Sequence, residues 1–326
     1  MKKTILLLTT ALCATWVSAQ ITITNATFPA EGDTLKMAFD AAPPTIEITP
    51  PGGDQNWDFS DLKLSFDRTL IYRPASEGSV GDQVPNADLF ADLGGDTEGY
   101  YRVTATAVEW VAVNGPDPIG FGISTVFKFN PPIIERRAPM NFFDINQISS
   151  ALLLPFSSDI IPDTLLSTLP LVPDSIRLRV SLQRLDVVDA WGKLTIPGGS
   201  YSVLREKRTE YRETRIDVLA PFIGWFDVTD LLLSNPNFSN LGVDTVLTYN
   251  FFNDQEKEPI AVVTMDAQQA NATQVMFKNN GVLINSAGDL ATEKPSVSAV
   301  PNPVVSQVDF DLSNWQTGNY DLKIFA

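Results

Sequence analysis

Prolines and glycines divide this chain into short segments, and this punctuation restricts its fold more than any other feature. The clearest clusters are Pro43-Pro44, Pro50-Pro51-Gly52-Gly53, Pro131-Pro132 and Pro197-Gly198-Gly199. Each cluster would end a long helix, because proline lacks the backbone N–H and clashes with the preceding helical turn. The runs between them are rich in Val, Ile, Thr, Phe and Tyr, which favour strands. The sequence therefore predicts an all-β fold, with helix in fewer than about a tenth of the residues.

Alternation of apolar and polar side chains locates the strands. It is clearest at the start of residues 176–187, where aliphatic side chains at even positions alternate with Arg, Ser and Gln at odd positions. Successive side chains of a strand point to opposite faces, so we expect one face here to be buried. By the same criterion we expect further strands at residues 100–113, 193–196 with 201–210, 243–252 with 259–265, and 274–278.

The order of these strands predicts two β-sandwich domains, at residues 20–173 and 174–288. One larger sandwich is the alternative. The apolar but irregular stretch at residues 139–173 is expected to cross between two sheets, with short helices at most. A polar, proline-containing linker is expected at residues 289–299, followed by a small, partial β domain at residues 300–326.

The first nineteen residues have the organisation of a secretory signal peptide. Lys2 and Lys3 precede an apolar run, and the small residues Ser18 and Ala19 end it. Such a segment is removed during export, so we expect residues 1–19 to be cleaved. A lipid anchor on Cys13 is the alternative, although the residues before Cys13 do not fit a lipobox.

Cysteine and histidine chemistry is missing from the rest of the chain. The sequence has one cysteine, Cys13, and no histidine. Once Cys13 is removed, disulfides, Cys/His zinc sites, cysteine nucleophiles and histidine-based triads are excluded. An enzyme would have to use carboxylates, tyrosine or a Ser/Lys pair, and none stands in a recognisable signature. We therefore expect no catalytic residue, no cofactor, and no pocket with two facing carboxylates beside residues 139–173.

The net charge of −16 over 326 residues limits the partners of the protein. A chain this acidic is repelled by nucleic acid and by anionic lipid. After residue 19 no stretch approaches the eighteen unbroken apolar residues that a membrane-spanning helix needs. We expect neither a nucleic-acid partner nor a membrane span.

The C-terminal residues carry the most specific motif in the chain. A Pro-Asn-Pro triplet precedes the alternating residues 308–312, and a Gly-x-Tyr triplet opens a second alternating run. This spacing resembles the beginning of a type A C-terminal sorting domain of the type IX secretion system of Bacteroidota. The motif residues are Pro301, Asn302, Pro303, Gly318 and Tyr320.

The resemblance implies a cellular location for the protein. Proteins with this domain pass through the periplasm and are then secreted or held at the outer cell surface by the type IX machinery. The family continues through further strands, whereas this sequence ends at Ala326 inside the domain. An aromatic residue often precedes the Pro-Asn-Pro, and here Val300 stands in its place.

Two groups of residues are candidates for ion binding or modification. Asp88, Asp92 and Asp96 lie on an acidic, glycine-rich loop that is a candidate calcium site, although the order of an EF-hand is absent. Solvated acidic residues are the alternative. Four Asp-Ser/Thr-aliphatic triplets resemble the O-glycosylation acceptors of exported Bacteroidota proteins, with Thr34, Thr164, Ser175 and Thr245 as the acceptors.

Residues 205–215 form the densest run of charge, REKRTEYRETR. At a period of two residues both faces are polar, so we expect a solvated hairpin arm with cross-strand charge pairs. A docking surface for an acidic glycan or a partner protein is the alternative.

We therefore expect an exported, non-enzymatic surface or secreted protein, adhesive or structural, whose partner is a surface glycan or another surface protein. A carbohydrate-binding module with a row of exposed aromatic side chains is the alternative. A glycoside hydrolase with a carboxylate pair is less favoured, because acidic residues are too frequent here for any pair to stand out.

Overall fold

The computed structural model describes residues 20–117, 124–157, 173–220, 222, 224–233 and 241–281, together with two short strands at 299–300 and 309–310. Strands account for 62% of the structure and helices for 6%, so the all-β prediction is confirmed. The chain has two compact units, Met1–Gly281 and Val282–Ala326. No helix within the described ranges is long and apolar enough to cross a membrane.

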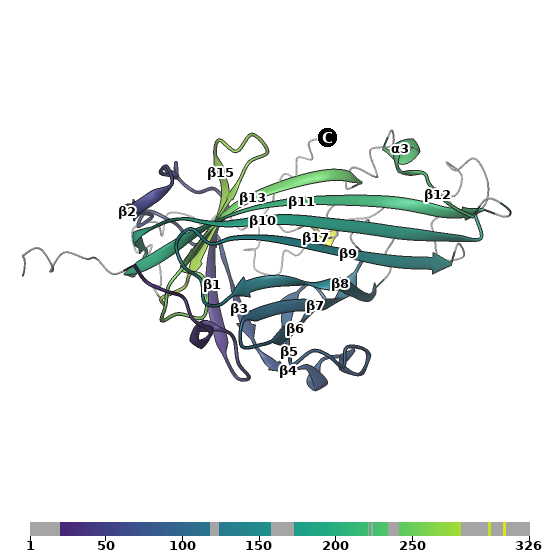
Figure 1. Ribbon diagram of the computed structural model, residues 1–326, viewed down its shortest axis with the longest axis horizontal. Helices are drawn as coiled ribbons and strands as arrows, with labels where there is room; N and C mark the ends of the chain where they lie inside the picture. The colour runs from purple at the N-terminus through teal and green to yellow at the C-terminus, as the bar shows by residue number, and fades with distance from the viewer. Residues whose placement is uncertain are drawn as a thin grey trace, which may run out of the picture. The chain divides into compact units, whose positions relative to one another are not determined.

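The larger sheet of the first unit has ten strands, in the order β2-β10-β11-β13-β14-β15-β1-β3, with β9 beside β10 and β12 beside β11. Its strands are β1 (Thr34–Asp40), β2 (Gly52–Asp58), β3 (Phe66–Ile71), β9 (Ile145–Ser157), β10 (Ser175–Ile196), β11 (Gly199–Ala220), β12 (Gly224–Asp227), β13 (Gly242–Phe252), β14 (Ala261–Met265) and β15 (Ala272–Lys278). The long strands β9, β10, β11 and β13 run side by side (Figure 1).

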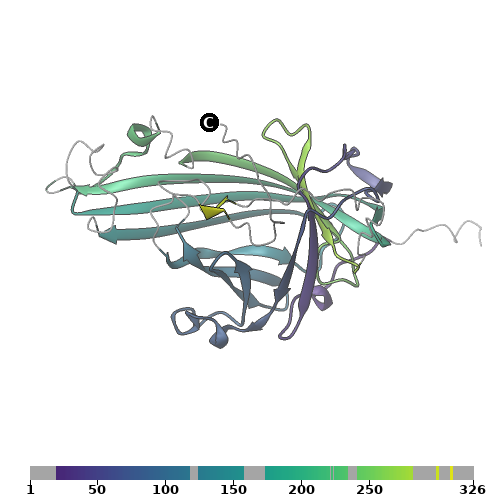
Figure 2. The same cartoon turned by 180° about the vertical axis from the view of Figure 1, so that it is seen from behind.

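The smaller sheet has the order β4-β5-β6-β7-β8 and is antiparallel throughout. Its strands are β4 (Arg73–Pro74), β5 (Leu89–Gly94), β6 (Thr97–Val103), β7 (Ala107–Pro116) and β8 (Ser124–Arg137). It lies beside the long strands of the larger sheet, with β8 next to β9 (Figure 2). Within the described residues, the helices are the one-turn η2 (Asn25–Thr27), η3 (Ala75–Glu77), η4 (Gly81–Gln83) and α3 (Thr229–Leu232).

The central element is the hairpin of β10 and β11, which pair from Ser175↔Leu219 to Ile196↔Gly199. Its turn is Pro197-Gly198, and Gly198 has a φ of 81°, a left-handed conformation that glycine adopts without steric cost. The hairpin expected around this turn is confirmed, and both strands are longer than the alternation indicated.

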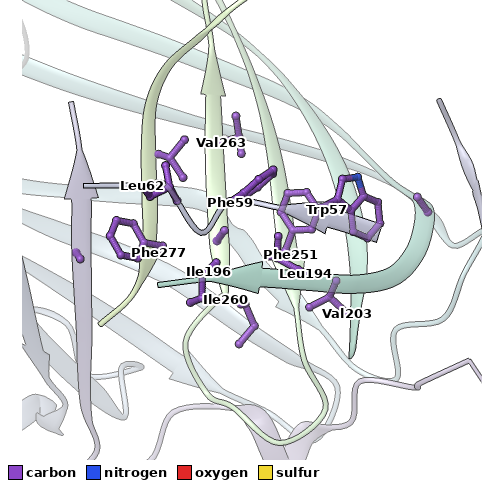
Figure 3. Packing of buried hydrophobic residues seen from close by; sticks show 14 of the residues in the cluster. Trp57, Phe59, Leu62, Leu194, Ile196, Val203, Phe251, Ile260, Val263 and Phe277 are labelled. Atoms are coloured by element: carbon purple, nitrogen blue, oxygen red, sulfur yellow. The ribbon is translucent and has the colours of Figure 1, made fainter. Parts of the chain in front are cut away.

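A bulge divides β10 into two parts that use different cores. The register shifts between Val188 and Ala190, and the bulge changes which side chains share a face. Beyond it, Leu194 and Ile196 pack with Trp57 and Phe251 in the largest hydrophobic core. Figure 3 shows this core, in which the ring of Phe251 lies edge-on to those of Trp57 and Phe59.

The single strand expected at residues 100–113 is wrong, because the structure has two strands there, β6 and β7. The turn between them is built on Thr104, whose Oγ1 accepts hydrogen bonds from the N–H groups of Thr106 and Ala107. Threonine side chains stabilise turns in this way. The alternation of apolar residues continues through the turn and hides it.

The crossing between two sheets that was expected at residues 139–173 is present at residues 139–144, which lead from β8 of the smaller sheet to β9 of the larger one, but the expectation is wrong for residues 145–157. Residues Ile145–Ser157 form β9, which pairs with β10 at every position from Ser157↔Ser175 to Ile145↔Val187. The consecutive leucines at 152–154 lie in this strand rather than in a helix. The larger sheet therefore contains strands from both sides of residues 173 and 174, where the sequence placed a boundary between two sandwiches: β9 before it and β10 after it.

Strand β2 pairs in parallel with the C-terminal part of β10, from Ala190↔Gly52 to Thr195↔Asp58. The two backbones approach closely at Gly192. A Cβ atom on Gly192 would overlap the backbone of Gln55, so only glycine fits there. In the second unit, β16 (Ala299–Val300) pairs with β17 (Asp309–Phe310).

Candidate functional site

The long strands present two faces, and each face carries a candidate site. We call inner face the one that carries Val180 and Leu182, because these residues share a cavity with the smaller sheet. We call outer face the opposite one, which carries Gln183 and Leu185. Side chains alternate between the two faces along each strand.

Five charged side chains form what we call the ionic cluster, on the inner face and under β8. Its members are Glu135, Arg184, Asp186, Glu206 and Arg208. Arg208 lies 3.1 Å from Asp186 and 3.0 Å from Glu206. Glu135, from the smaller sheet, lies 3.4 Å from Arg184 and 3.5 Å from Arg208. The cluster therefore joins the two sheets through charge.

Backbone carbonyls of β8 complete this junction. Arg184 donates to the carbonyl of Ile134, and Arg208 Nη2 donates to the carbonyl of Glu135 at 2.9 Å. Ser150 Oγ of β9 donates to the carbonyl of Pro131 at 2.7 Å. Strand β8 is the last of its sheet, so side chains of the larger sheet take the place of a further strand.

Burial shifts the pKa values of two charged side chains in this region. Burial raises the pKa of Glu206 above its ordinary range, and Arg208 beside it opposes the rise. Burial also lowers the pKa of Arg136 to about 10. Arg136 Nη2 donates to the carbonyls of Thr27 and Lys257, each at 2.8 Å. Every carboxylate of the ionic cluster has an arginine within 3.5 Å, an arrangement that suits a structural junction between buried surfaces.

A cavity of about 250 Å³ lies next to the ionic cluster and shares Glu135 with it. Its roof is aromatic and comes from the smaller sheet, with Trp110 on β7 and Phe127 and Phe129 on β8. Its floor is aliphatic and includes Leu152 of β9 and Val180 and Leu182 of β10. Most of the exposed wall is therefore apolar.

Polar groups in the wall of this cavity are few. Glu210 and Arg212 of β11 pair with each other at 2.6 Å, and Glu135 is held by the arginines of the ionic cluster. Trp110 Nε1 is buried and has no hydrogen-bond partner among the described residues. Residues 139–173, beside which we expected no pocket with two facing carboxylates, border this cavity through β9. The two carboxylates in its wall, Glu135 and Glu210, each have an arginine partner.

The outer face carries a diagonal row of exposed apolar side chains, which we call the apolar stripe. It consists of Ile145 on β9, Leu185 on β10, Tyr211 on β11 and Val243 on β13. Their exposed fractions are 67%, 37%, 51% and 69%.

The strand register makes these four residues neighbours. Leu185 is opposite Gln147 and Thr209, and Tyr211 is opposite Thr245. Each member of the apolar stripe therefore lies two residues away from the position opposite the previous one. Such diagonal neighbours are about 7–8 Å apart, within reach of long and aromatic side chains.

The structure does not bring the calcium candidates together. Asp88 Oδ2 accepts a hydrogen bond from the N–H of Val103, and Asp92 Oδ1 accepts one from the N–H of Gly94, both at 2.8 Å. Asp96 has a left-handed backbone, with a φ of 58°, in the turn between β5 and β6. In the part of the chain that the structure describes, no three Asp, Glu, Cys or His side chains form a group that could hold a metal ion.

The glycosylation candidates differ in their surroundings. Thr34 is exposed at the start of β1, whereas Ser175 and Thr245 are half-buried within strands. Thr164 lies outside the described residues, as does the signal segment. The sorting-motif residues Pro301, Asn302, Pro303, Gly318 and Tyr320 also lie outside them.

The expectation of a solvated arm at residues 205–215 is wrong at its start. Arg205 and Glu206 are buried on opposite faces of β11. Cross-strand charge pairs are present, as expected, with Arg208 opposite Asp186. Glu206 is buried because the smaller sheet covers the inner face here. Arg205 is buried because the largest hydrophobic core covers the outer face.

Sequence reasoning missed both the cavity and the apolar stripe. One signal of the inner face was available, because the aliphatic even positions of β10 change to Arg184 and Asp186 within the same strand. Two charged side chains on the same strand face as buried aliphatic ones indicate that a second layer covers this face and contributes charged groups that pair with them. Comparison with known proteins adds no assignment, since no protein-family model, no curated protein and no solved structure matches this chain.

Proposed function

We propose that this chain is an exported, non-enzymatic β protein that acts by contact, as an adhesive or structural component of the cell surface or its surroundings. Export rests on the signal-like residues 1–19 and on the sorting motif at residues 300–326. The type IX secretion machinery is its proposed partner in export, and another surface protein is its proposed partner outside the cell.

The apolar stripe is the observation that carries this proposal. Four large apolar side chains lie in one line across four strands, and each is at least 37% exposed. Contiguous exposed apolar surface marks interaction sites more often than isolated apolar residues do. Amide and hydroxyl side chains border the stripe, among them Gln183, Thr209 and Thr245. A surface of this kind, apolar with a polar border, is typical of protein interfaces.

Carbohydrate binding is the second candidate. A sugar-binding groove would be expected to present two or three exposed aromatic rings, and the stripe has one, at Tyr211. A hydrolase is third, because the carboxylates of the cavity, Glu135 and Glu210, each have an arginine partner rather than standing free as an acid and a base.

The test compares two equally exposed positions. Tyr211→Asp places a charge in the apolar stripe, whereas Leu153→Asp places one on the outer face of β9 away from it; the wild-type side chains are 51% and 57% exposed. We expect cells that export the Tyr211→Asp chain to release it into the medium, and the Leu153→Asp chain to stay with the washed cells or their matrix. Equal retention of both chains would contradict the proposal. Binding of the wild-type chain to purified polysaccharide, abolished by Tyr211→Asp, would favour the second candidate.

A further inference from the structure

We propose that the pocket between β3 and β5 binds an extended, acidic segment of a partner protein, which pairs with the edge of β3 as an additional strand. None of the residues of the apolar stripe lines this pocket. It is therefore a second interaction site, independent of the contact proposed above.

The pocket lies where the chain of β3 and β4 turns away from β5. Strand β4 pairs with β5 at Arg73↔Phe90. If this antiparallel pairing continued, Ile71 would lie opposite Asp92, but β3 pairs with β1 of the larger sheet instead. A pocket of about 260 Å³ lies between the two strands and is lined by Thr69 and Ile71 of β3 and by Asp92 of β5. It thus marks the point at which strand pairing between the two sheets ends.

The edge of β3 supplies backbone groups for an additional strand. Within the described residues, β3 is the last strand of the larger sheet. Just beyond β3, Tyr72 donates its N–H to the carbonyl of Asp33 and accepts from the N–H of Gly32, both at 2.9 Å, so its backbone groups point toward β1. Alternate residues of a strand direct these groups to opposite sides, and Thr69 and Ile71 therefore direct theirs away from β1. Unpaired groups at this spacing are a template for another strand.

The charges that line the pocket favour an acidic partner. Arg68 and Arg73 are exposed and form no ion pair with a carboxylate of the described residues. The guanidinium carbon of Arg68 lies 5.5 Å from the ring centroid of Phe39, a contact that positions the cation without neutralising it. Asp92 is the only carboxylate among the described residues that line the pocket, and its Oδ1 already accepts the N–H of Gly94. Two cations and one anion leave an excess of positive charge, which an acidic segment complements.

The apolar lining favours a polypeptide over an acidic polysaccharide. Ile71 is 41% exposed, and Phe90 and Leu93 of β5 also line the pocket. Arg68 and Ile71 are an odd number of residues apart, so their side chains lie on opposite faces of β3. A partner strand with Asp or Glu on one face and Val or Ile on the other matches both, and its backbone can pair with Thr69. An acidic polysaccharide offers carboxylates alone, so we expect a polypeptide in which acidic and aliphatic residues alternate.

The first test compares three labelled eight-residue peptides on the full chain by fluorescence polarisation. Glutamate and valine alternate in the first, the second has four glutamates followed by four valines, and lysine and valine alternate in the third. We expect the first to bind, the second to bind at least about tenfold more weakly because it cannot match both faces of β3, and the third not to bind measurably. Equal binding of the first two would overturn strand addition. Failure of the first to bind, or equal binding of the third, would overturn the proposal as a whole.

Two substitutions of Thr69 separate its backbone from its side chain. Thr69→Pro removes the N–H that points away from β1 and leaves the pairing with β1 intact, because proline is tolerated on an edge strand where the N–H faces outward. Thr69→Val keeps the N–H and removes only the hydroxyl. We expect Thr69→Pro to abolish binding of the alternating acidic peptide and Thr69→Val to bind it as the wild-type chain does. Equal binding by the two variants would exclude pairing with β3.

Two further substitutions test the charges. Arg68→Gln and Arg73→Gln should each weaken binding of the acidic peptide about two- to fivefold, the range for exposed ion pairs, and wild-type affinity in both variants would overturn the acidic specificity. Circular dichroism checks folding, and the arginine variants remain decisive if Thr69→Pro does not fold. A dimer of the wild-type chain in sedimentation, abolished by Thr69→Pro, would identify a second copy as the occupant and overturn the choice of a different protein.

Discussion

Arg205 and Asp189 form a two-pronged ion pair in the interior of the larger sheet, with Arg205 Nε 2.8 Å from Asp189 Oδ1 and Nη2 3.0 Å from Oδ2. The third nitrogen, Nη1, donates to the carbonyl of Thr49 at 2.9 Å. The rings of Trp57 and Tyr249 lie 5.5 and 5.2 Å from the guanidinium carbon. Arginine is suited to such a site because its planar fork matches a carboxylate and also packs on aromatic faces.

Asp189→Asn should strongly destabilise the protein, because it leaves the guanidinium of Arg205 buried without a counter-charge. Breaking a buried ion pair from one side costs about 3–5 kcal/mol, and urea unfolding followed by circular dichroism would measure it. The control is Glu213→Gln, which removes a partly exposed partner of Arg215 and should change the free energy of unfolding little. Similar losses in the two variants would show that the pair contributes no more than a surface pair.

Asp217 should stabilise the fold at neutral pH and cease to do so in acid. Burial by itself would raise the pKa of Asp217, but hydrogen bonds from Arg179 and Arg177 outweigh it and hold the pKa below the ordinary value of 3.8. A lowered folded-state pKa gives stability above the unfolded-state pKa that is lost as the pH falls through the folded-state value. Unfolding free energies of wild type and Asp217→Asn should differ at pH 7 and converge below pH 3.8. A difference independent of pH would refute this assignment.

Glu206 should have the opposite pH dependence. Burial raises its pKa above the ordinary value of 4.5, so the folded state binds its proton more tightly than the unfolded state does. The stability that this proton confers is present below pH 4.5 and is lost as the pH rises toward the folded-state value. Relative to wild type, Glu206→Gln should therefore gain stability between pH 4.5 and 7, as measured by urea unfolding at several pH values. A loss over that interval would contradict the expected direction.

Gly192→Ala should disrupt the parallel pairing of β2 with β10. The added Cβ would overlap the backbone of Gln55, which can yield only if the two strands separate. Overpacking of this kind costs about 1–3 kcal/mol. Lys193→Ala, at an exposed neighbouring position, is the control. Hydrogen exchange should show faster exchange of the β2 amides in Gly192→Ala only, and equal protection in both variants would exclude a role for the close approach.

Local patterns predicted the hairpin but not the sheet around it. The start of residues 176–187 alternates cleanly, and Pro197-Gly198-Gly199 marks a turn, so parts of β10 and β11 follow from neighbouring residues alone. The joining of residues 176–187 and 193–196 into one strand does not follow from them. Strand β9 was hidden because Leu152, Leu153 and Leu154 form an unbroken apolar run, although Leu153 points outward with 57% exposure.

The candidate sites could not be predicted from local sequence patterns, for a different reason. The apolar stripe takes one residue from each of four strands, and its members align only once the register is fixed. The cavity likewise needs two sheets, with Trp110 from one and Leu152 from the other. Neither arrangement produces a periodic pattern in any single segment of the sequence.

The place of β1 in the larger sheet bears on the order in which the protein can fold. Strand β1 lies between β3 and β15, so Met37 pairs with Arg68 on one side and with Lys278 on the other. Contacts between residues this distant in sequence form slowly, because a long loop must close before they stabilise anything. The β10–β11 hairpin can close early from its own turn, whereas one of the first strands to leave the ribosome must wait for one of the last before both its edges are paired.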